Sequence, residues 1–204
     1  MDLGIDRLLN IFNENNIIYW LDSGTLLGLE RDGKLISGDK DIDISVLGNN
    51  RILPLILNLK NVDVKVKKYQ GKVVKIKIYG LNERVIDISF FIDTGKNFYS
   101  SPQFNINSNH FLLKISLIKK ILTSYLYRVK SLDYNIFILF KIVRIGYWLI
   151  PKDLICVDQL QKQKNNKYNL PFKVNEYLTY RYGDWSKKIS NWSSTKDDKG
   201  LYFF

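Results

Sequence analysis

The sequence predicts a mixed α/β fold of the α+β class: a mixed sheet with flanking helices, then a mainly helical C-terminal half. Two observations support this class. Between residues 42 and 92, short segments alternate aliphatic with charged residues, which places one strand face on a core and the other in water. From residue 111 the chain becomes rich in Leu, Ile and Tyr at spacings typical of helices. A run of strands followed by a run of helices along the chain is typical of α+β proteins.

The elements of the first half follow from periodicity and turn residues. The predicted helices are residues 2–15, 25–31 and 51–60. Pro54 is tolerable in the last of these because it falls in the first turn. The predicted strands are residues 17–21, 42–47, 62–69, 73–79 and 84–92. Short turns join the last three, so they are expected to be antiparallel neighbours.

The second half is expected to be mostly helical. Residues 111–150 form a long helical region, broken near residues 131–133 and ended by Pro151. Residues 160–170 are polar and loop-like. A last helix is expected to start near Asn175 and to end at Gly183. We expect a catalytic region over residues 1–110 and a helical region over 111–204, packed together in one compact unit.

Composition excludes several kinds of site. With 204 residues, 46% hydrophobic and 25% charged, the chain has the composition of a globular domain with a sizeable core. A single cysteine, Cys156, allows no intramolecular disulfide. A structural zinc site normally takes four Cys or His ligands, and the chain has one of each. Nothing near His110 indicates a Ser–His or Cys–His nucleophile.

The net charge of +11 favours polyanionic partners, although a lysine-rich solvated surface explains it equally well. The N-terminus carries acidic residues before any apolar stretch, unlike a signal peptide. No apolar run reaches the roughly 18 to 20 residues of a membrane-spanning helix, so a cytoplasmic protein is expected. Basic residues within 111–150 permit peripheral contact with the inner face of the membrane. Bundle packing with snorkelling lysines is the favoured explanation of them.

The candidate site is a run of aspartates on a predicted strand. Asp41 and Asp43 share one strand face, and Ile42 and Ile44 share the other. Carboxylates about 4 Å apart repel by roughly 4 kcal/mol, a cost that a divalent cation removes. Oxygen ligands suit Mg²⁺, with Mn²⁺ as an alternative. Asp39 adds to this site or holds a water beside it, whereas the competing explanation is a solvated acidic turn.

A third ligand is expected from a later strand. Asp87 lies between Ile86 and Ile88, where an aspartate is otherwise a costly inward charge. We therefore expect Asp41, Asp43 and Asp87 to hold the metal. Either Asp87 or Asp39 is a candidate base for an attacking hydroxyl.

A turn of small residues, Ser23-Gly24-Thr25, precedes the aspartates. Gly24 can adopt a positive φ and lets a phosphate approach the backbone. Thr25 offers a hydroxyl at a helix N-terminus, whose N–H groups favour anions. Arg31 can grip a phosphate through two hydrogen bonds. A plain strand–turn–helix junction with a surface arginine is the alternative.

These residues resemble a known family. The segment LDSGTLLGLERDG followed by GDKDIDIS is similar to the LicD family, which includes the fukutin-type proteins and belongs to the nucleotidyltransferase superfamily. The resemblance resumes at Val85-Ile86-Asp87 and at the C-terminal segment EYLTYRYGDW. Ser37-Gly38 and Lys40 depart from the family pattern, which often has Pro-Trp and an acidic residue at these places. The departures bear on the donor and leave the metal ligands in place.

The resemblance implies a nucleotidyltransferase-like fold and a magnesium-dependent transferase. It would move phosphocholine, or a related phospho-alditol or phospho-amino alcohol, from a CDP-activated donor to a cell-surface glycan, free or lipid-linked. Such glycans occur in lipopolysaccharide and capsule. Asp41, Asp43 and Asp87 would hold the metal, and Ser23 with its two turn neighbours and Arg31 would hold the donor diphosphate. Tyr182 would stack on a sugar or on the donor head group, or would pack its helix against the catalytic region.

Two other functions compete with this one. A true nucleotidyltransferase would move NMP onto a protein, RNA or small molecule, but the usual G-S-x-A-R-G motif is absent. A non-enzymatic module that binds nucleic acid or membrane would explain the charge and leave the aspartates unexplained. No nucleic-acid-binding motif is present, so nucleic acid is not favoured as a partner.

Overall fold

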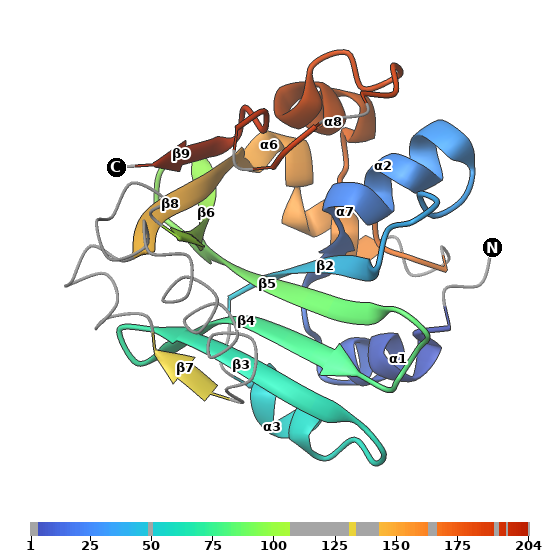
Figure 1. Ribbon diagram of the computed structural model, residues 1–204, viewed down its shortest axis with the longest axis vertical. Coiled ribbons are helices and arrows are strands. Elements are labelled where there is room, and N and C mark those ends of the chain that lie inside the picture. The colour runs from blue at the N-terminus through green and yellow to red at the C-terminus, as the bar shows by residue number, and fades with distance from the viewer. Residues whose placement is uncertain are drawn as a thin grey trace, which may run out of the picture.

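The computed structural model describes residues 4–48, 51–106, 131–133, 143–162, 167–189, 192–194 and 196–203. Strands and helices are mixed along these residues, so the predicted α+β class is confirmed (Figure 1). None of the helices in this part of the chain is both long and apolar enough to cross a bilayer.

The first half contains the predicted elements in the predicted order. Its helices are α1 (Asp6–Glu14), α2 (Ser23–Asp32) and α3 (Ile52–Leu57). Its strands are β1 (Tyr19–Leu21), β2 (Asp41–Leu47), β3 (Asp63–Tyr69), β4 (Lys72–Tyr79), β5 (Val85–Asp93) and β6 (Phe98–Ile106). Of these elements, β6 was not anticipated from the sequence.

The second half departs from the expected helix. Its strands are β7 (Ser131–Asp133), β8 (Val143–Pro151) and β9 (Leu201–Phe203). Its helices are α6 (Lys152–Ile155), α7 (Val157–Lys162) and α8 (Val174–Tyr182). The prediction of helix is therefore wrong at β8, whereas residues 111–130 and 134–142 of the same region lie outside the described residues. Helix α7 also enters the predicted loop, and α8 ends at Gly183 as predicted.

Strand β8 shows why the helix prediction failed. Gly146, Trp148 and Ile150 are buried while the residues between them are partly exposed, which is the period of two of a strand. A Cβ at Gly146 would lie 2.7 Å from the Phe203 ring of β9, so this position has no room for a side chain. β8 pairs antiparallel with β6 and β9. The division into regions at residue 110 stays a prediction.

Within the described residues the strands form one nine-stranded sheet, whose main path runs β7-β3-β4-β5-β6-β8-β9. β2 branches from this path because it pairs in parallel with β5, and β1 pairs with β2. β3, β4 and β5 are antiparallel neighbours, as predicted. β5 reaches β6 only through its last two residues. The order β2-β5-β4-β3 sets the layout of the candidate site.

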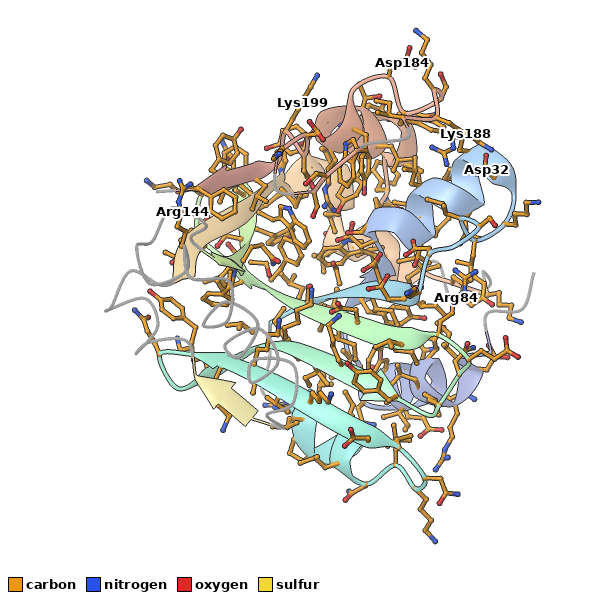
Figure 2. The ribbon with its side chains drawn as sticks, in the orientation of Figure 1. Asp32, Arg84, Arg144, Asp184, Lys188 and Lys199 are labelled. Atoms are coloured by element: carbon orange, nitrogen blue, oxygen red, sulfur yellow. The ribbon has the colours of Figure 1, made fainter. Side chains whose placement is uncertain are left out.

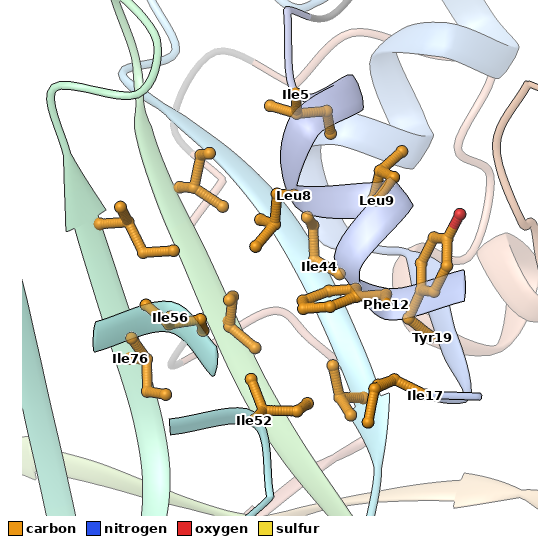
Figure 3. Close-up of a cluster of buried hydrophobic side chains, with 14 of the residues drawn as sticks. Ile5, Leu8, Leu9, Phe12, Ile17, Tyr19, Ile44, Ile52, Ile56 and Ile76 are labelled. Carbon is orange, nitrogen blue, oxygen red and sulfur yellow. The ribbon is translucent and has the colours of Figure 1, made fainter. Parts of the chain in front are cut away.

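One face of these four strands packs against α1 and α3. Figure 3 shows Leu8 and Phe12 of α1 and Ile56 of α3 close to Ile44 and Ile76 of the sheet, and all five side chains are buried. Since side chains alternate along a strand, the opposite face carries the residues between these apolar positions. That second face holds the aspartates.

A second buried cluster joins the C-terminal helix to the rest of the protein. Trp20, Leu26 and Phe91 pack with Trp148 and Leu178, which brings β1, α2, β5, β8 and α8 together. Figure 1 shows α2 and α8 at the same end of the molecule. This packing places α8 beside the turn at the start of α2.

Candidate metal and phosphate site

Three aspartates lie together where β2 begins. One carboxylate oxygen from each of Asp39, Asp41 and Asp43 lies within 4.8 Å of the others, and all three residues are half-buried. Mg²⁺ prefers oxygen ligands and usually binds through one or two carboxylates together with water or phosphate. The donor set therefore fits a magnesium ion that keeps positions for a substrate.

The electrostatics of these carboxylates also favour a cation. Burial, a hydrogen bond with Asp39 and the charge of Asp87 together raise the pKa of Asp41 to about 6. Burial, with the charges of Asp87 and Asp41, raises the pKa of Asp43 well above its usual range. Like charges disfavour ionisation, and a bound cation reverses that effect.

Asp87 lies on β5 directly opposite Asp43 on β2. Its Oδ2 forms ion pairs with Lys75 Nζ at 3.0 Å and with Lys77 Nζ at 2.9 Å. Burial opposes ionisation of Asp87, but the two ammonium groups outweigh it and leave its pKa below the usual range. Among the described residues, the buried Oδ1 has no hydrogen-bond partner. One oxygen of Asp87 is thus held by lysines, and the other is left for a ligand.

The N-terminus of α2 contacts the aspartates directly. The Gly24 N–H donates to Asp43 Oδ2 at 3.1 Å, and the Asp43 N–H donates to Thr25 Oγ1 at 2.8 Å. A Cβ at Gly24 would lie 2.6 Å from Asp39 Oδ2. Gly24 does not use the positive φ that a glycine can adopt, and it is Ser23 that has a φ of 48°. Gly24 is instead required for the close approach of the carboxylates.

Of the other predicted donor-binding residues, Arg31 lies apart from this cluster, whereas Tyr182 is close enough that burial and then charges including that of Asp43 raise its pKa. Arg31 is in the last turn of α2, where its Nη2 pairs with Asp32 at 3.1 Å. At 1.5 Å per residue it is roughly 10 Å along the helix from Gly24. Figure 2 labels Asp32 at the end of α2 farther from the sheet. Tyr182 packs on Trp192 with ring centroids 4.9 Å apart. The part that Arg31 and Tyr182 take in donor binding stays a prediction.

A buried polar network, which the sequence did not predict, ties α8 to the start of α2. Asp22 Oδ1 accepts from the Tyr177 hydroxyl and from Arg181 Nη1, both at 2.6 Å. Asp22 Oδ2 accepts from the Ser45 hydroxyl. Arg181 Nε also donates to Asp198 at 3.0 Å. Asp22 and Arg181 are each 1% exposed, so neither charge has solvent to stabilise it.

The sequence carried a weak signal for this network. Asp22 ends an apolar strand, and Arg181 falls among apolar and aromatic residues of a helix. An aspartate or arginine at such a position needs a partner. Periodicity does not identify which distant residue supplies it.

Carboxylates on neighbouring parallel strands, packed against a helix N-terminus, offer oxygen ligands suited to a divalent cation beside N–H groups that favour anions. A comparison with models of known protein families identifies the family of this chain. The sequence model described as LicD/FKTN/FKRP, nucleotidyltransferase domain, matches residues 16–119. The chain belongs to this family, as its resemblance to LicD proteins predicted. The matched residues include the small-residue turn and all four aspartates of the site, and they exclude α8.

Three curated relatives each match this chain over only part of their own length. An uncharacterized protein of Rickettsia typhi is 33% identical over 82 residues, covering 40% of this chain and 25% of that protein. Ribitol-5-phosphate transferase FKTN of Macaca fascicularis is 28% identical over 111 residues, covering 46% of this chain and 24% of that protein. The Homo sapiens protein of the same name is 27% identical over 111 residues, with the same coverage. The chain therefore spans about a quarter of the length of these curated relatives.

Proposed function

We propose that the protein is a metal-dependent transferase that moves a phosphorylated group from a nucleotide-activated donor to a glycan. The observation that carries this proposal is the cluster of Asp39, Asp41 and Asp43 against the N-terminus of α2. Family membership supports it, and curated relatives are named ribitol-5-phosphate transferase. We infer a CDP-activated donor carrying a phospho-alditol or phosphocholine, and a glycan acceptor, free or lipid-linked.

The residues present fit Mg²⁺ or Mn²⁺. Asp39, Asp41 and Asp43 would hold the ion, with Asp87 Oδ1 as a further ligand from β5. When bound, the ion would neutralise charge on the donor phosphates. The same ion explains how three half-buried carboxylates are stable side by side.

The small-residue turn is suited to the donor. Ser23 provides a hydroxyl group at the positive end of the α2 dipole, where a diphosphate is stabilised, and the buried Thr25 hydroxyl supports the turn by accepting from the Asp43 N–H. The Gly24 N–H already donates to Asp43, so the turn also fixes the carboxylate that faces the donor. We infer that the turn positions the donor phosphorus close to the aspartates.

Asp87 is the favoured base, with Asp39 as the alternative. In the transfer, the acceptor hydroxyl oxygen bonds to the distal phosphorus, the bond from that phosphorus to the CMP oxygen breaks, and the hydroxyl proton passes to a carboxylate. Asp87 Oδ1 is buried and has no hydrogen-bond partner among the described residues, so it is able either to bind the ion or to accept that proton. It serves as the base where Asp39, Asp41 and Asp43 alone hold the ion. Its low pKa makes it a weak base that acts as the attack proceeds.

Transfer of the nucleotide itself is the second candidate, because the matching family domain is described as a nucleotidyltransferase domain. The two candidates differ in their products. The protein and Mg²⁺ are incubated with CDP-ribitol or CDP-choline and a panel of glycans, and products are followed by mass spectrometry. Release of CMP, with a glycan mass gain equal to the phosphorylated group, is expected. A mass gain equal to CMP on any acceptor would replace the first candidate by the second.

A further inference from the structure

The face of the sheet that carries the aspartates continues into four lysines. Lys75 and Lys77 lie on β4, and Lys65 and Lys67 lie on β3. Lys77 is opposite Asp87 on one side and opposite Lys65 on the other, and Lys75 is opposite Lys67. Directly opposed residues share a sheet face. The four side chains therefore form two adjacent rows, here called the lysine rows, that begin next to Asp87.

The lysine rows bring several ammonium groups close together. Lys75 and Lys77 both pair with the same oxygen of Asp87, which brings their two positive charges to one carboxylate oxygen. Burial first, and then the charge of Lys75, lower the pKa of Lys67 to about 8. Like charges so close repel one another, and an anion bound among them would relieve that repulsion.

These lysines differ from a solvated surface patch. The side chains of Lys75 and Lys77 are 22% and 25% exposed, which removes much of the water that would otherwise stabilise their charge. Partly desolvated ammonium groups make stronger charge-assisted hydrogen bonds to phosphate than exposed ones do. The rows also stand beside the aspartates rather than on a remote part of the protein.

We propose that Lys67, Lys75 and Lys77 bind a phosphate group of a substrate on the side of Asp87 away from Asp43. Neighbouring strands lie about 4.8 Å apart, so β4 is roughly 10 Å from β2. The bound phosphate therefore lies beside the metal carboxylates and is not held by them. Its place in the reaction rests on the proposed function, and it suits an acceptor that already carries a phosphate.

The test uses Lys67, because its removal leaves both ion pairs of Asp87 in place. Binding of glucose 6-phosphate is measured by calorimetry in EDTA, and binding of CDP is measured with Mg²⁺. Lys67→Gln should weaken glucose 6-phosphate binding by about tenfold or more, the loss of one charge-assisted hydrogen bond. Lys67→Arg, which keeps the charge, and Lys72→Gln, which removes an exposed lysine of β4, should bind as the wild type does.

A measurement on the wild-type protein guards against a variant that fails to fold. Glucose 6-phosphate should slow the chemical acetylation of Lys67, Lys75 and Lys77, and should leave that of Lys72 unchanged. Weaker binding of CDP alone in Lys67→Gln would assign the phosphate to the donor. Unchanged binding of both ligands, or equal losses in Lys67→Gln and Lys72→Gln, would overturn the lysine site.

A further variant separates this proposal from the transferase activity. Asp41→Asn should abolish transfer and should keep glucose 6-phosphate binding in EDTA. If wild-type protein transfers nothing and Lys67→Gln still loses the sugar phosphate, the proposed function fails and the anion site stands. If Asp41→Asn loses glucose 6-phosphate binding while remaining folded, the phosphate depends on the aspartates and the lysine site is wrong.

Discussion

Tyr177 donates its hydroxyl hydrogen to Asp22 Oδ1 at 2.6 Å, across 155 residues of chain. Asp22 directly precedes the turn that contacts the metal ligands, and its own N–H donates to the carbonyl oxygen of Asp43 at 3.1 Å. Arg181 reaches the same Asp22 oxygen from the next turn of α8. The position of the aspartates thus depends on a helix outside the part of the chain that matches the family domain.

Arg181→Met should destabilise the protein by about 3 to 5 kcal/mol, because it leaves the buried carboxylates of Asp22 and Asp198 without their charge partner. Urea unfolding followed by circular dichroism measures the change. Lys173→Gln is the control, since it removes an exposed pair with Asp153 and should cost less than about 1 kcal/mol. Equal losses in the two variants would mean that the buried network has no special importance.

Gly24→Ala should weaken metal binding about tenfold or more while the protein remains folded. The new methyl group would lie 2.6 Å from Asp39 Oδ2 and would push that carboxylate out of the cluster. Titration with Mn²⁺, followed by electron paramagnetic resonance, measures the affinity. Glu30→Ala changes an exposed side chain of the same helix and should bind Mn²⁺ normally. An unchanged affinity in Gly24→Ala would mean that Asp39 does not bind the ion.

Metal affinity should fall as the pH is lowered through about 6, the pKa of Asp41. The cation needs the deprotonated carboxylate, so protons and metal compete for the same oxygens. Above about pH 7 the affinity for Mn²⁺ should level off, and below pH 6 it should drop by up to about tenfold per pH unit. A constant affinity between pH 5 and 7.5 would exclude Asp41 as a ligand.

In EDTA, Asp41→Asn should be more stable than the wild type at pH 7.5. The folded-state pKa of Asp41 is about 6, above its usual value of 3.8, so between these values the folded state binds more protons than the unfolded state. Metal-free wild type therefore gains stability as the pH falls, and the advantage of the variant should shrink from about 1 kcal/mol toward zero near pH 4. A variant less stable than wild type at pH 7.5 would show that the charge of Asp41 is compensated in the absence of metal.

The elements around the site were predictable because their side chains alternate clearly. Strands β3, β4 and β5 carry charged residues between aliphatic ones, and this pattern has no helical counterpart. β8 is apolar or aromatic at most positions, so periods of 2 and 3.6 fit it equally, and pairing with β6 and β9 decides its structure.

The partners across strands were less predictable than the strands themselves. The placement of Asp41 and Asp43 on one face followed from their spacing. Two lysines hold one oxygen of Asp87 because of the register between β4 and β5. No local sequence pattern specifies that register. The pairing of Asp22 with Arg181 spans 159 residues and is likewise a tertiary property.

The length of the Asp22–Arg181 connection has a consequence for biosynthesis. Contacts of such high sequence separation form late in folding, since the loop between them must close first. A ribosome-bound chain that ends before α8 holds Asp22 without Tyr177 and Arg181, so the turn beside the aspartates lacks its support. Competence to bind metal should therefore arise only after α8 has emerged from the ribosome, as a single cooperative event rather than in stages.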